Sequence, residues 1–418
     1  MRLSLAPVFC LLVPTLACYY PRGEVPATLP RDYSAVIKDN IHARSLNRRQ
    51  IPSQRVALTN VRVFDGSCLQ PPSTVYIENG RISQCVACEG GNCPPAETYD
   101  GQGMTLLPGL IDAHAHPMNV TNLEDLAKAG VTTAVNAFCP APPLCASLKN
   151  HTGLTSLVTA SFLATAPGSE HAMIVGPLGA PYLIHNASQA GPFVAQQVKQ
   201  GADFIKMIGS APETGLTQAE QNALVAASHK AGKQVILHAP RHAAYVQGLL
   251  AGADQIHHST LDTPIDDRVV DMFKKNRNTI VCPTLVAMRA IVEQIKPANE
   301  TYDSAVETVT KLHEAGVTIL AGTDSFENGD SAVQAEVPFG SSLHDELENL
   351  VAAGLSPVEA LNAATINAAR HFGLADRAVI REGMRADLLL VRGDPTVNIS
   401  ATRDIAGIWI GGVQVKSQ

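Results

Sequence analysis

Short apolar runs alternate with helical stretches through the middle of this chain, and the alternation restricts the fold more than any other feature of the sequence. One unit reads Asp203–Ile208, then Thr217–Gly232, then Gln234–Leu237. Strand-like runs separated by helices are typical of βαβ units around a parallel sheet. The pattern fills residues 106–377, about 270 residues. That length fits a closed (β/α)8 TIM barrel better than an open sheet, so we predict an α/β barrel.

Shorter β-like runs separated by turns lie on both sides of this region. Asp65-Gly66 and Asn79-Gly80 are turn signals in the first part, and Gly411-Gly412 is one in the last part. Residues 50–105 and 378–418 are therefore predicted to form one small β-sandwich domain from both chain ends.

The N-terminus has the features of a secretory signal. Arg2 precedes an apolar stretch from Ala6 to Leu16, and Thr15-Leu16-Ala17 is a pattern that a signal peptidase could cleave. The stretch is shorter than the roughly 20 residues that cross a bilayer, and no later segment qualifies. Residues 1–17 are predicted to be a signal peptide, and the mature protein is predicted to be secreted, extracellular and free of the membrane.

Five N-x-S/T sequons agree with passage through the secretory pathway, where such sites are glycosylated. Residues 18–49 are polar and end in the dibasic pair Arg48-Arg49, which proteases of that pathway cleave. We expect this segment to be either a propeptide that is removed or an ordered arm that packs on the domain. The sequons lie at Asn119, Asn150, Asn186, Asn299 and Asn398.

Cysteine usage suggests disulfides and at least one free thiol. Cys282 lies in an apolar run and is expected to be buried and inert. Cys139 and Cys145 bracket a proline-rich loop that a disulfide could close. A further cluster of four could bind structural zinc, but two disulfides are its expected use in an oxidising compartment. The four are Cys68, Cys85, Cys88 and Cys93.

The charge balance argues against a nucleic-acid partner. The chain has 31 basic and 38 acidic residues, a formal charge of -7, and no long basic run that could neutralise successive phosphates. Its hydrophobic content of 45% is enough for a sizeable core, which excludes a disordered chain.

Six polar residues share one position, at or just after the end of an apolar strand-like run. In a barrel these strand ends converge on one face, where active sites form. A His-x-His pair directs both imidazoles to one side, because side chains alternate with period two, and this suits a shared metal. A lysine inside an apolar strand must pair, lose its proton or be modified. The six are His114, His116, Lys206, His238, His258 and Asp324.

The order of these residues resembles the amidohydrolase superfamily. Three phrases carry the resemblance, which covers roughly residues 55–418: Pro-Gly-Leu-Ile-Asp-Ala-His-Ala-His at 108–116, Ala-Gly-Thr-Asp-Ser at 321–325, and Glu-Gly-Met-Arg-Ala-Asp-Leu at 382–388. The lysine-containing pattern is similar to that of Xaa-Pro and Xaa-Arg dipeptidases and of fungal ochratoxinase, with imidazolonepropionase more distant.

The resemblance implies two divalent metal ions, with zinc as the default for such nitrogen and oxygen ligands. It assigns His114, His116 and Asp324 to the more buried ion and His238 and His258 to the more exposed one. Lys206, carbamylated by carbon dioxide, would bridge both. A hydroxide between the metals would attack the scissile carbonyl, and Asp324 would move its proton to the leaving nitrogen.

The family pattern is broken at Ile256-His257-His258, where relatives commonly have Ile-Glu-His. Strand alternation and alignment favour His258 as the ligand, although the assignment could shift to His257. Elsewhere, Gly168-Ser169-Glu170-His171 resembles a Gly-Gly-His loop whose histidine binds or polarises the substrate, and a surface histidine is the alternative.

A basic loop follows His238 and contains Arg241 and His242. In related peptidases this loop faces the substrate. The planar guanidinium of Arg241 could grip a substrate carboxylate, or it could be an exposed structural arginine.

We therefore predict a secreted, metal-dependent amidohydrolase that cleaves amide bonds of N-acyl amino acids or dipeptide-like substrates, a class that extends to mycotoxin-type amides. Catalysis is assigned to Asp324 and His171, and substrate binding to Arg241, His242 and His171. The alternatives are a cyclic amide or lactone hydrolase with the same metals, and a non-catalytic secreted binding glycoprotein. The motifs leave the oligomeric state open, a homo-oligomer included.

Overall fold

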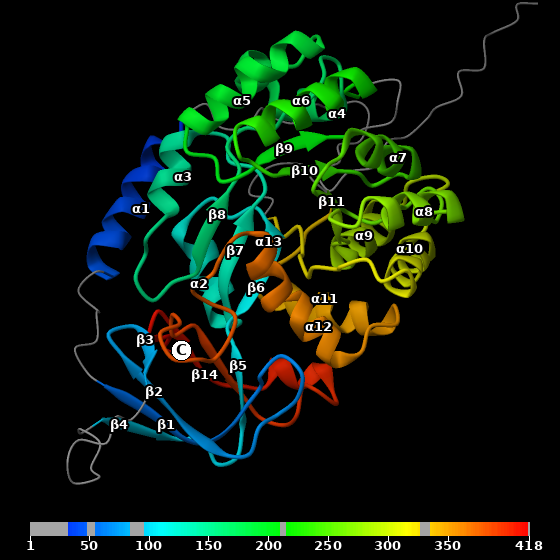
Figure 1. The fold of residues 1–418 in the computed structure, drawn as a ribbon. Coiled ribbons are helices and arrows are strands. Elements are labelled where there is room, and N and C mark those ends of the chain that lie inside the picture. The colour runs from blue at the N-terminus through cyan, green and yellow to red at the C-terminus, as the bar shows by residue number, and fades with distance from the viewer. Residues whose placement is uncertain (1–31, 48–54, 84–95, 210–214, 327–334, 417–418) are drawn as a thin grey trace, which may run out of the picture.

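The computed structural model describes residues 32–47, 55–83, 96–209, 215–326 and 335–416. Parallel strands and helices alternate through the middle of the chain, and a mixed sheet formed by both chain ends lies below them (Figure 1). The fold is therefore α/β, with parallel sheets and one mixed sheet. The predicted signal peptide lies outside the described residues.

Within the described ranges, seven parallel strands form two sheets, ordered β6-β7-β8 and β12-β11-β10-β9. Most of their side chains are buried, as expected for parallel strands that are covered by helices on their outer face. The strands are β6 (Leu110–Ala115), β7 (Val131–Asn136), β8 (Ser156–Thr159), β9 (Ile205–Ile208), β10 (Val235–His238), β11 (Gln255–His257) and β12 (Ile280–Cys282).

Isolated parallel bridges connect the two sheets at both edges. The residues after β8 pair with β9, and a segment around residues 319–325 lies between β12 and β6. No single closed sheet is assigned in the described part of the chain, so the closed barrel stays a prediction. The bridges join Ala164 to Met207, Val281 to Ile319 and Ala115 to Ser325.

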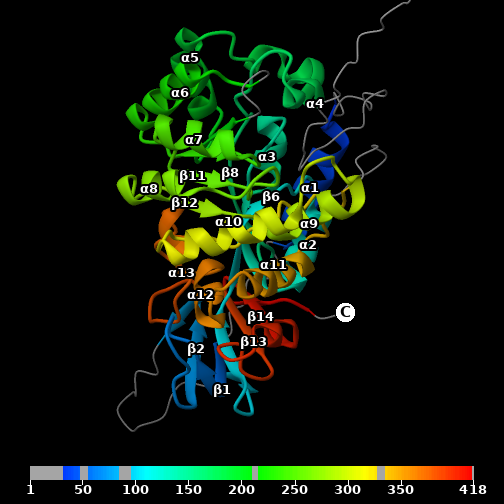
Figure 2. The same cartoon turned by 90° about the vertical axis from the view of Figure 1, so that its right-hand side faces the viewer.

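Helices cover the outer side of the parallel strands (Figure 2). One of them, α6, begins at a capping box in which Thr217 and Glu220 each bond the other's backbone N–H. The helices are α2 (Val120–Lys128), α3 (Pro142–Leu148), α4 (Glu170–Gly179), α5 (Ala190–Lys199), α6 (Gln218–Lys230), α7 (His242–Ala251), α8 (Asp267–Lys275), α9 (Leu285–Ala290), α10 (Tyr302–Glu314), α11 (Ser341–Ala352), α12 (Pro357–Ala363) and α13 (Ile366–His371).

An additional helix, α1 (Ser34–Asn47), precedes the mixed sheet and lies beside α3 (Figure 1). Its Asn40 is buried and donates to Ser147 Oγ at 3.0 Å, while Asn40 Oδ1 accepts from the Val120 backbone N–H at 3.1 Å. This part of the 18–49 segment is thus an ordered arm that packs on the domain. Whether the chain is cleaved at Arg48-Arg49 remains a prediction.

The mixed sheet has its own core, which includes Leu58, Ile77, Leu390 and the buried indole of Trp409. The strands form one connected sheet in the order β15-β14-β13-β5-β1-β2-β3, with β4 also paired to β1, where we predicted a sandwich of two sheets. In β1, residues 56–59 pair with β4 and residues 62–63 pair with β5, and the pairing with β2 contains a register shift between Leu58 and Val61. The strands are β1 (Val56–Val63), β2 (Ser73–Glu78), β3 (Arg81–Ser83), β4 (Glu97–Asp100), β5 (Thr105–Pro108), β13 (Leu388–Val391), β14 (Ile405–Ile410) and β15 (Val413–Gln414).

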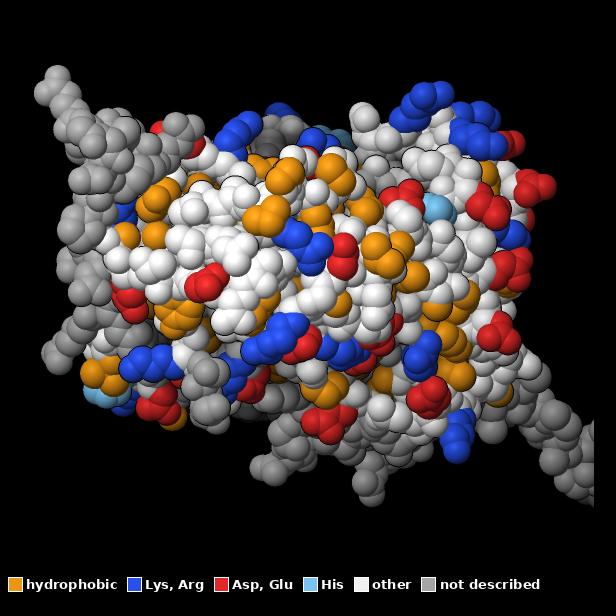
Figure 3. Space-filling model, turned by 90° about the horizontal axis from the view of Figure 1, so that it is seen from below, with side chains coloured by type: hydrophobic (Ala, Val, Ile, Leu, Met, Phe, Trp, Pro, Cys, Tyr) orange, Lys and Arg blue, Asp and Glu red, His pale blue; other side chains and the backbone are white. Residues whose placement is uncertain are grey.

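Charged side chains of both signs are interspersed on the lower face of the molecule (Figure 3). Exposed ion pairs such as Arg392–Asp404, at 2.7 Å, occur in the C-terminal part of the chain. Such pairs contribute little to stability, because solvent screens them. Within the described residues, no helix is both long and apolar enough to cross a membrane.

The cysteines agree with the predictions in part. Cys139 and Cys145 form the expected disulfide, and Cys282 is a buried free thiol. Cys68 has a free, exposed thiol, so the prediction of two disulfides within the four-cysteine cluster is wrong. This thiol lies in a tight turn and contacts Gln70 Nε2 at 3.4 Å. The other three cysteines of that cluster lie outside the described residues.

Candidate active site

Asp324 lies at the centre of a buried polar cluster at the carboxyl end of β6. Its Oδ1 lies 2.8 Å from His116 Nε2 and 3.3 Å from His114 Nε2. One ring nitrogen from each histidine and one carboxylate oxygen of Asp324 lie within 4.8 Å of one another. The two histidines therefore converge as their period-two spacing predicts, and with Asp324 they form a set that could hold one cation.

Asp112 fixes the geometry of this set from within β6. Its Oδ1 accepts from the backbone N–H groups of His114 and Thr323, each at 3.1 Å, and its Oδ2 accepts from Thr323 Oγ1 at 2.6 Å. One carboxylate thus ties the strand that carries His114 to the turn that carries Asp324. Burial raises the pKa of Asp112 to about 7, and the hydrogen bonds oppose this rise.

The remaining predicted ligands face the same cluster. Lys206 Nζ, from β9, lies 3.5 Å from His114 Nε2. The ring of His238, at the end of β10, lies 4.3 Å from that of His258 between centroids. The His258 ring in turn lies 4.9 Å from the His114 ring. The structure therefore brings together all six residues that the sequence placed at strand ends, and all six are buried.

His171 belongs to the same group, at the start of α4. Its ring lies 4.5 Å from the His238 ring between centroids. The residue is buried, so the alternative of a surface histidine is wrong. Burial lowers the pKa of His171 to about 3, with a further contribution from Lys206. Its imidazole is therefore neutral and can donate only one hydrogen bond.

The protonation states suit metal binding. Burial lowers the pKa values of His114, His238 and His258 well below the usual range, so these rings are neutral and each keeps one lone pair. His258 Nδ1 lies 2.9 Å from Thr284 Oγ1, whereas His258 Nε2 and Asp324 Oδ2 are buried with no hydrogen-bond partner in the described part of the chain. Buried polar atoms without partners are costly, and bound cations would satisfy both atoms. The residues present therefore fit a metal centre.

His257 has a different environment from His258. Its Nδ1 lies 2.9 Å from His114 Nδ1, and its Nε2 lies 3.0 Å from Gln255 Oε1. Both ring nitrogens are therefore occupied by protein atoms. This geometry supports His258 rather than His257 as the ligand.

The basic loop after β10 pairs with acidic residues. Arg241 Nη2 donates to Glu300 Oε1 at 2.9 Å, and His242 Nε2 lies 3.6 Å from Asp266 Oδ1. Arg241 is therefore in an ion pair rather than an exposed structural arginine, and any substrate carboxylate would have to compete with Glu300.

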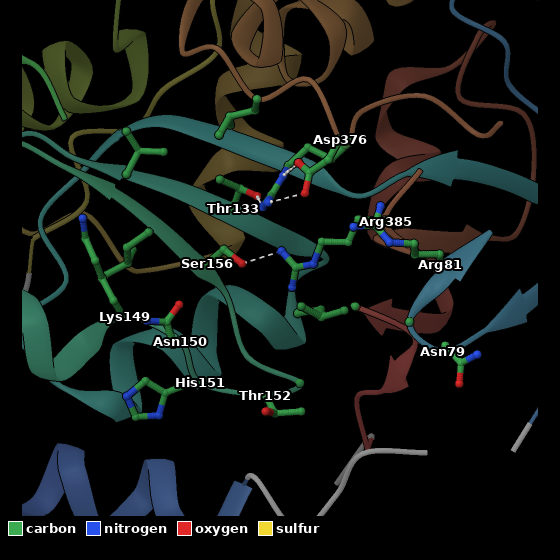
Figure 4. A pocket seen from close by; sticks show the side chains of 18 residues that line it. Asn79, Arg81, Thr133, Lys149, Asn150, His151, Thr152, Ser156, Asp376 and Arg385 are labelled. Carbon is green, nitrogen blue, oxygen red and sulfur yellow. Dashed lines mark hydrogen bonds and ion pairs between the residues drawn. The ribbon is translucent and has the colours of Figure 1, made fainter. Parts of the chain in front are cut away.

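A separate polar cavity of about 570 Å3 lies at the other ends of the parallel strands, where they meet the mixed sheet (Figure 4). Arg385 is central to it and donates to Ser156 Oγ at 2.6 Å, at the start of β8. Arg377 lines it as well and donates to Thr133 Oγ1 at 3.0 Å, in β7. None of the predicted site residues lines this cavity.

Sequence reasoning missed the residues that hold the predicted ligands in place. Asp112, Gln255 and Thr284 each contact a histidine of the cluster or its backbone. Glu346, on α11, accepts from the backbone N–H groups of Leu285 and Val286 and so holds the turn after Thr284. A signal existed for Asp112, because an acidic residue in an apolar strand needs partners. The others carried no comparable signal.

Comparison with known proteins agrees with this geometry. The model of the amidohydrolase family matches residues 105–415. This chain belongs to the amidohydrolase family. An uncharacterized protein of Mycobacterium tuberculosis is 27% identical over 322 residues, which cover 70% of this chain and 80% of that protein.

Solved structures of other proteins share the fold. A Xaa-Pro dipeptidase with methionine bound in its active site has a TM-score of 0.70 and 21% identity, and the match covers 87% of this chain and all of that one. Ochratoxinase of A. niger has a TM-score of 0.70 and 16% identity, covering 87% of this chain and 96% of that one. As an amidohydrolase, the protein is a metal-dependent hydrolase of C–N bonds that acts on small-molecule substrates.

Proposed function

We propose that this amidohydrolase cleaves the amide bond of N-acyl amino acids or dipeptide-like compounds, including mycotoxin-type amides. The observation that carries the proposal is the convergence of four histidines, one lysine and one aspartate in a single buried cluster at the carboxyl ends of parallel strands. The similarity in fold to a Xaa-Pro dipeptidase and to ochratoxinase supports the substrate class. We also propose that the two linked parallel sheets are the halves of a closed (β/α)8 barrel.

Two divalent ions, zinc by default, are proposed as cofactors. His114, His116 and Asp324 would hold one, and His238 and His258 the other. Divalent ions bound here would polarise the scissile carbonyl and supply a hydroxide nucleophile at neutral pH. Carbamylation would turn Lys206, which is buried with its Nζ 3.5 Å from His114 Nε2, into an anionic ligand for both ions. The negative charge of the carbamate would offset part of the positive charge of the two ions.

The protein's own groups are placed to manage protons and substrate. Asp324 Oδ2 has no hydrogen-bond partner among the described residues, so it can accept a proton from the attacking water and deliver it to the leaving nitrogen. His171 is neutral, and its Nδ1 likewise has no partner in the described ranges. We propose that it binds the substrate carbonyl, and that Arg241 and His242 bind the substrate carboxylate.

Secretion is part of the proposal. It is supported by the apolar N-terminal stretch and by four sequons whose asparagines are exposed: Asn150, Asn186, Asn299 and Asn398. A secreted hydrolase of this type suits nutrient release or detoxification better than an intracellular metabolic step.

Metal analysis tests the proposed centre. Protein purified without chelator should contain close to two divalent ions per chain. Lys206→Ala should lose metal, and short carboxylic acids should restore part of it by replacing the carbamate. One tightly bound ion, together with an unmodified Lys206 by mass spectrometry, would overturn the binuclear proposal.

Hydrolysis of N-acyl amino acids and of their matched carboxamides tests the substrate class. The wild type should prefer the free acids, and Arg241→Ala should lose that preference. If the wild type treats acids and amides alike, the proposed carboxylate contact is wrong. Activity restricted to cyclic amides or lactones would favour that alternative.

A further inference from the structure

A chain of hydrogen bonds runs from Gln234, just before β10, through two residues of β11 to His114 in the buried cluster. Gln255 Nε2 donates to Gln234 Oε1 at 3.1 Å, and Gln255 Oε1 lies 3.0 Å from His257 Nε2. His257 Nδ1 then lies 2.9 Å from His114 Nδ1. Gln255, His257 and His114 are all buried. Solvent therefore does not supply alternative partners for these contacts.

The contacts fix where the protons lie. Gln255 Oε1 can only accept, so His257 Nε2 carries the hydrogen. A neutral His257 then has a lone pair on Nδ1, and the 2.9 Å contact requires that His114 Nδ1 donates to it. His114 Nε2 is consequently left with a lone pair. That nitrogen lies 3.3 Å from Asp324 Oδ1 and 3.5 Å from Lys206 Nζ.

The reverse arrangement would leave His114 Nε2 without a lone pair for a metal ion. If His257 Nδ1 carried a hydrogen as well, the ring would be a buried cation with no acidic hydrogen-bond partner in the described part of the chain, which is costly. His114 would then have to accept at Nδ1 and carry its hydrogen on Nε2, the nitrogen that faces Asp324 and Lys206.

We infer that His257 is a positioning residue that fixes the tautomer and ring orientation of His114, and that Gln255 orients His257 in turn. The inference rests on the proposed metal centre, in which His114 is a ligand. A metal-binding imidazole usually donates its second N–H to a carboxylate or carbonyl. This chain uses a neutral imidazole as the acceptor, so the centre contains one negative charge fewer than it would with an acidic residue at position 257.

Two variants of the same position separate the hydrogen bond from the space that the ring fills. In His257→Gln, the amide can accept from His114 through Oε1 and donate to Gln255 through Nε2, so the order of donors and acceptors is kept. The leucine of His257→Leu has a similar volume and offers neither a hydrogen-bond donor nor an acceptor. The measurement is the zinc dissociation constant of each purified, chelator-treated protein, determined by competition with a chromogenic chelator.

The expected result is a roughly 10- to 100-fold weaker binding of one zinc ion by His257→Leu, the usual effect of losing such a partner. His257→Gln should stay within about threefold of wild type, because its hydrogen bonds are retained. Equal weakening in both variants, or no weakening in either, would overturn the inference. Urea unfolding of the zinc-free proteins shows whether each variant is folded.

Gln255→Leu and Gln255→Glu repeat the test with the imidazole in place, should His257→Leu fail to fold. The leucine variant should weaken zinc binding and the glutamate variant should not, because only glutamate keeps an acceptor for His257. Failure of the proposed function would look different. In that case the wild type itself would bind no zinc, and His114→Ala would match it.

Discussion

Glu300→Gln tests the electrostatics of the basic loop beside the cluster. Glu300 lies just before α10, and its side chain is only 3% exposed. Its Oε1 accepts from Arg241 at 2.9 Å, whereas its Oε2 has no hydrogen-bond partner among the described residues. Burial raises the pKa of Glu300 to about 7, although Arg241 acts in the opposite direction. The ion pair is therefore only partly ionised near neutral pH.

The size of the effect follows from the pKa difference between the two states. An unfolded glutamate titrates near pH 4.3, so in the window from about 4.3 to 7 the folded state binds more protons than the unfolded state. The contribution of Glu300 to stability is thus fully present below about pH 4.3 and is lost as the pH rises through 7. At about 1.36 kcal/mol per pH unit, the loss is at most about 3 to 4 kcal/mol. Glutamine does not titrate, so the stability of the variant lacks this pH-dependent contribution.

Urea unfolding of the wild type and of Glu300→Gln between pH 4.5 and 8.5 measures the difference. As the pH rises across this range, the free energy of unfolding of the variant should increase relative to that of the wild type by up to about 3 kcal/mol. Other titrating groups act in both proteins and cancel in the difference. Glu307→Gln, at an exposed ion pair with Lys311, is the matched control and should show almost no pH-dependent difference. A difference between Glu300→Gln and wild type that stays constant with pH would refute the reasoning.

Three further predictions concern the ligand scaffold, the N-terminal arm and the sequons. Asp112→Ala should destabilise the protein by about 3 kcal/mol or more, because two backbone N–H groups and one hydroxyl lose their acceptor; Asp112→Asn should cost less, as urea unfolding would show. Asn40→Ala should lower the free energy of unfolding by about 1–3 kcal/mol in the same assay, with Lys38→Ala, at an exposed position, as the control. No effect of Asn40→Ala would indicate that the arm has been cleaved from the mature protein. Glycopeptide mapping should find Asn119 unmodified, because it is half-buried whereas the asparagines of the other four sequons are exposed; a glycan at Asn119 would refute this prediction.

The elements that the sequence predicted well are those set by local pattern. Apolar runs of strand length and the helices between them identified the parallel strands. The period-two rule placed His114 and His116 on one side. Lys206 could be found because a lysine is costly inside an apolar strand. These signals lie within a few residues of one another, so they can be read without a structure.

The contacts that the sequence did not predict join segments far apart in the chain. Thr323 and Asp112 are 211 positions apart, and Arg241 and Glu300 are 59 apart. Local pattern cannot say which acidic residue an arginine will meet. The expectation for Arg241 was therefore incomplete: its charge was evident from the sequence, but the buried partner that competes for it was not.

The backbone explains why strand alternation alone does not predict the side-chain directions of His257 and His258. Adjacent residues of a regular strand point to opposite faces, yet both rings lie within 5 Å of the His114 ring, at 4.8 and 4.9 Å between centroids. His258 has a φ of 75°, in the left-handed region, so the chain leaves the strand at this residue and turns its side chain back toward the cluster.

Two other non-glycine residues of the site share this conformation: Thr284, with a φ of 48°, and Asp324, with a φ of 56°. Each such residue costs on the order of 1–3 kcal/mol, and glycine would adopt the conformation at little cost. The chain has side chains there instead, and in each case the side chain contacts the cluster. The strain is offset by fixed contacts such as those of Asp112 and Glu346 with the adjoining turns. A positive φ at His258 would let neighbouring histidines take the two roles proposed for them on one face, His258 as a ligand and His257 as the partner that orients His114.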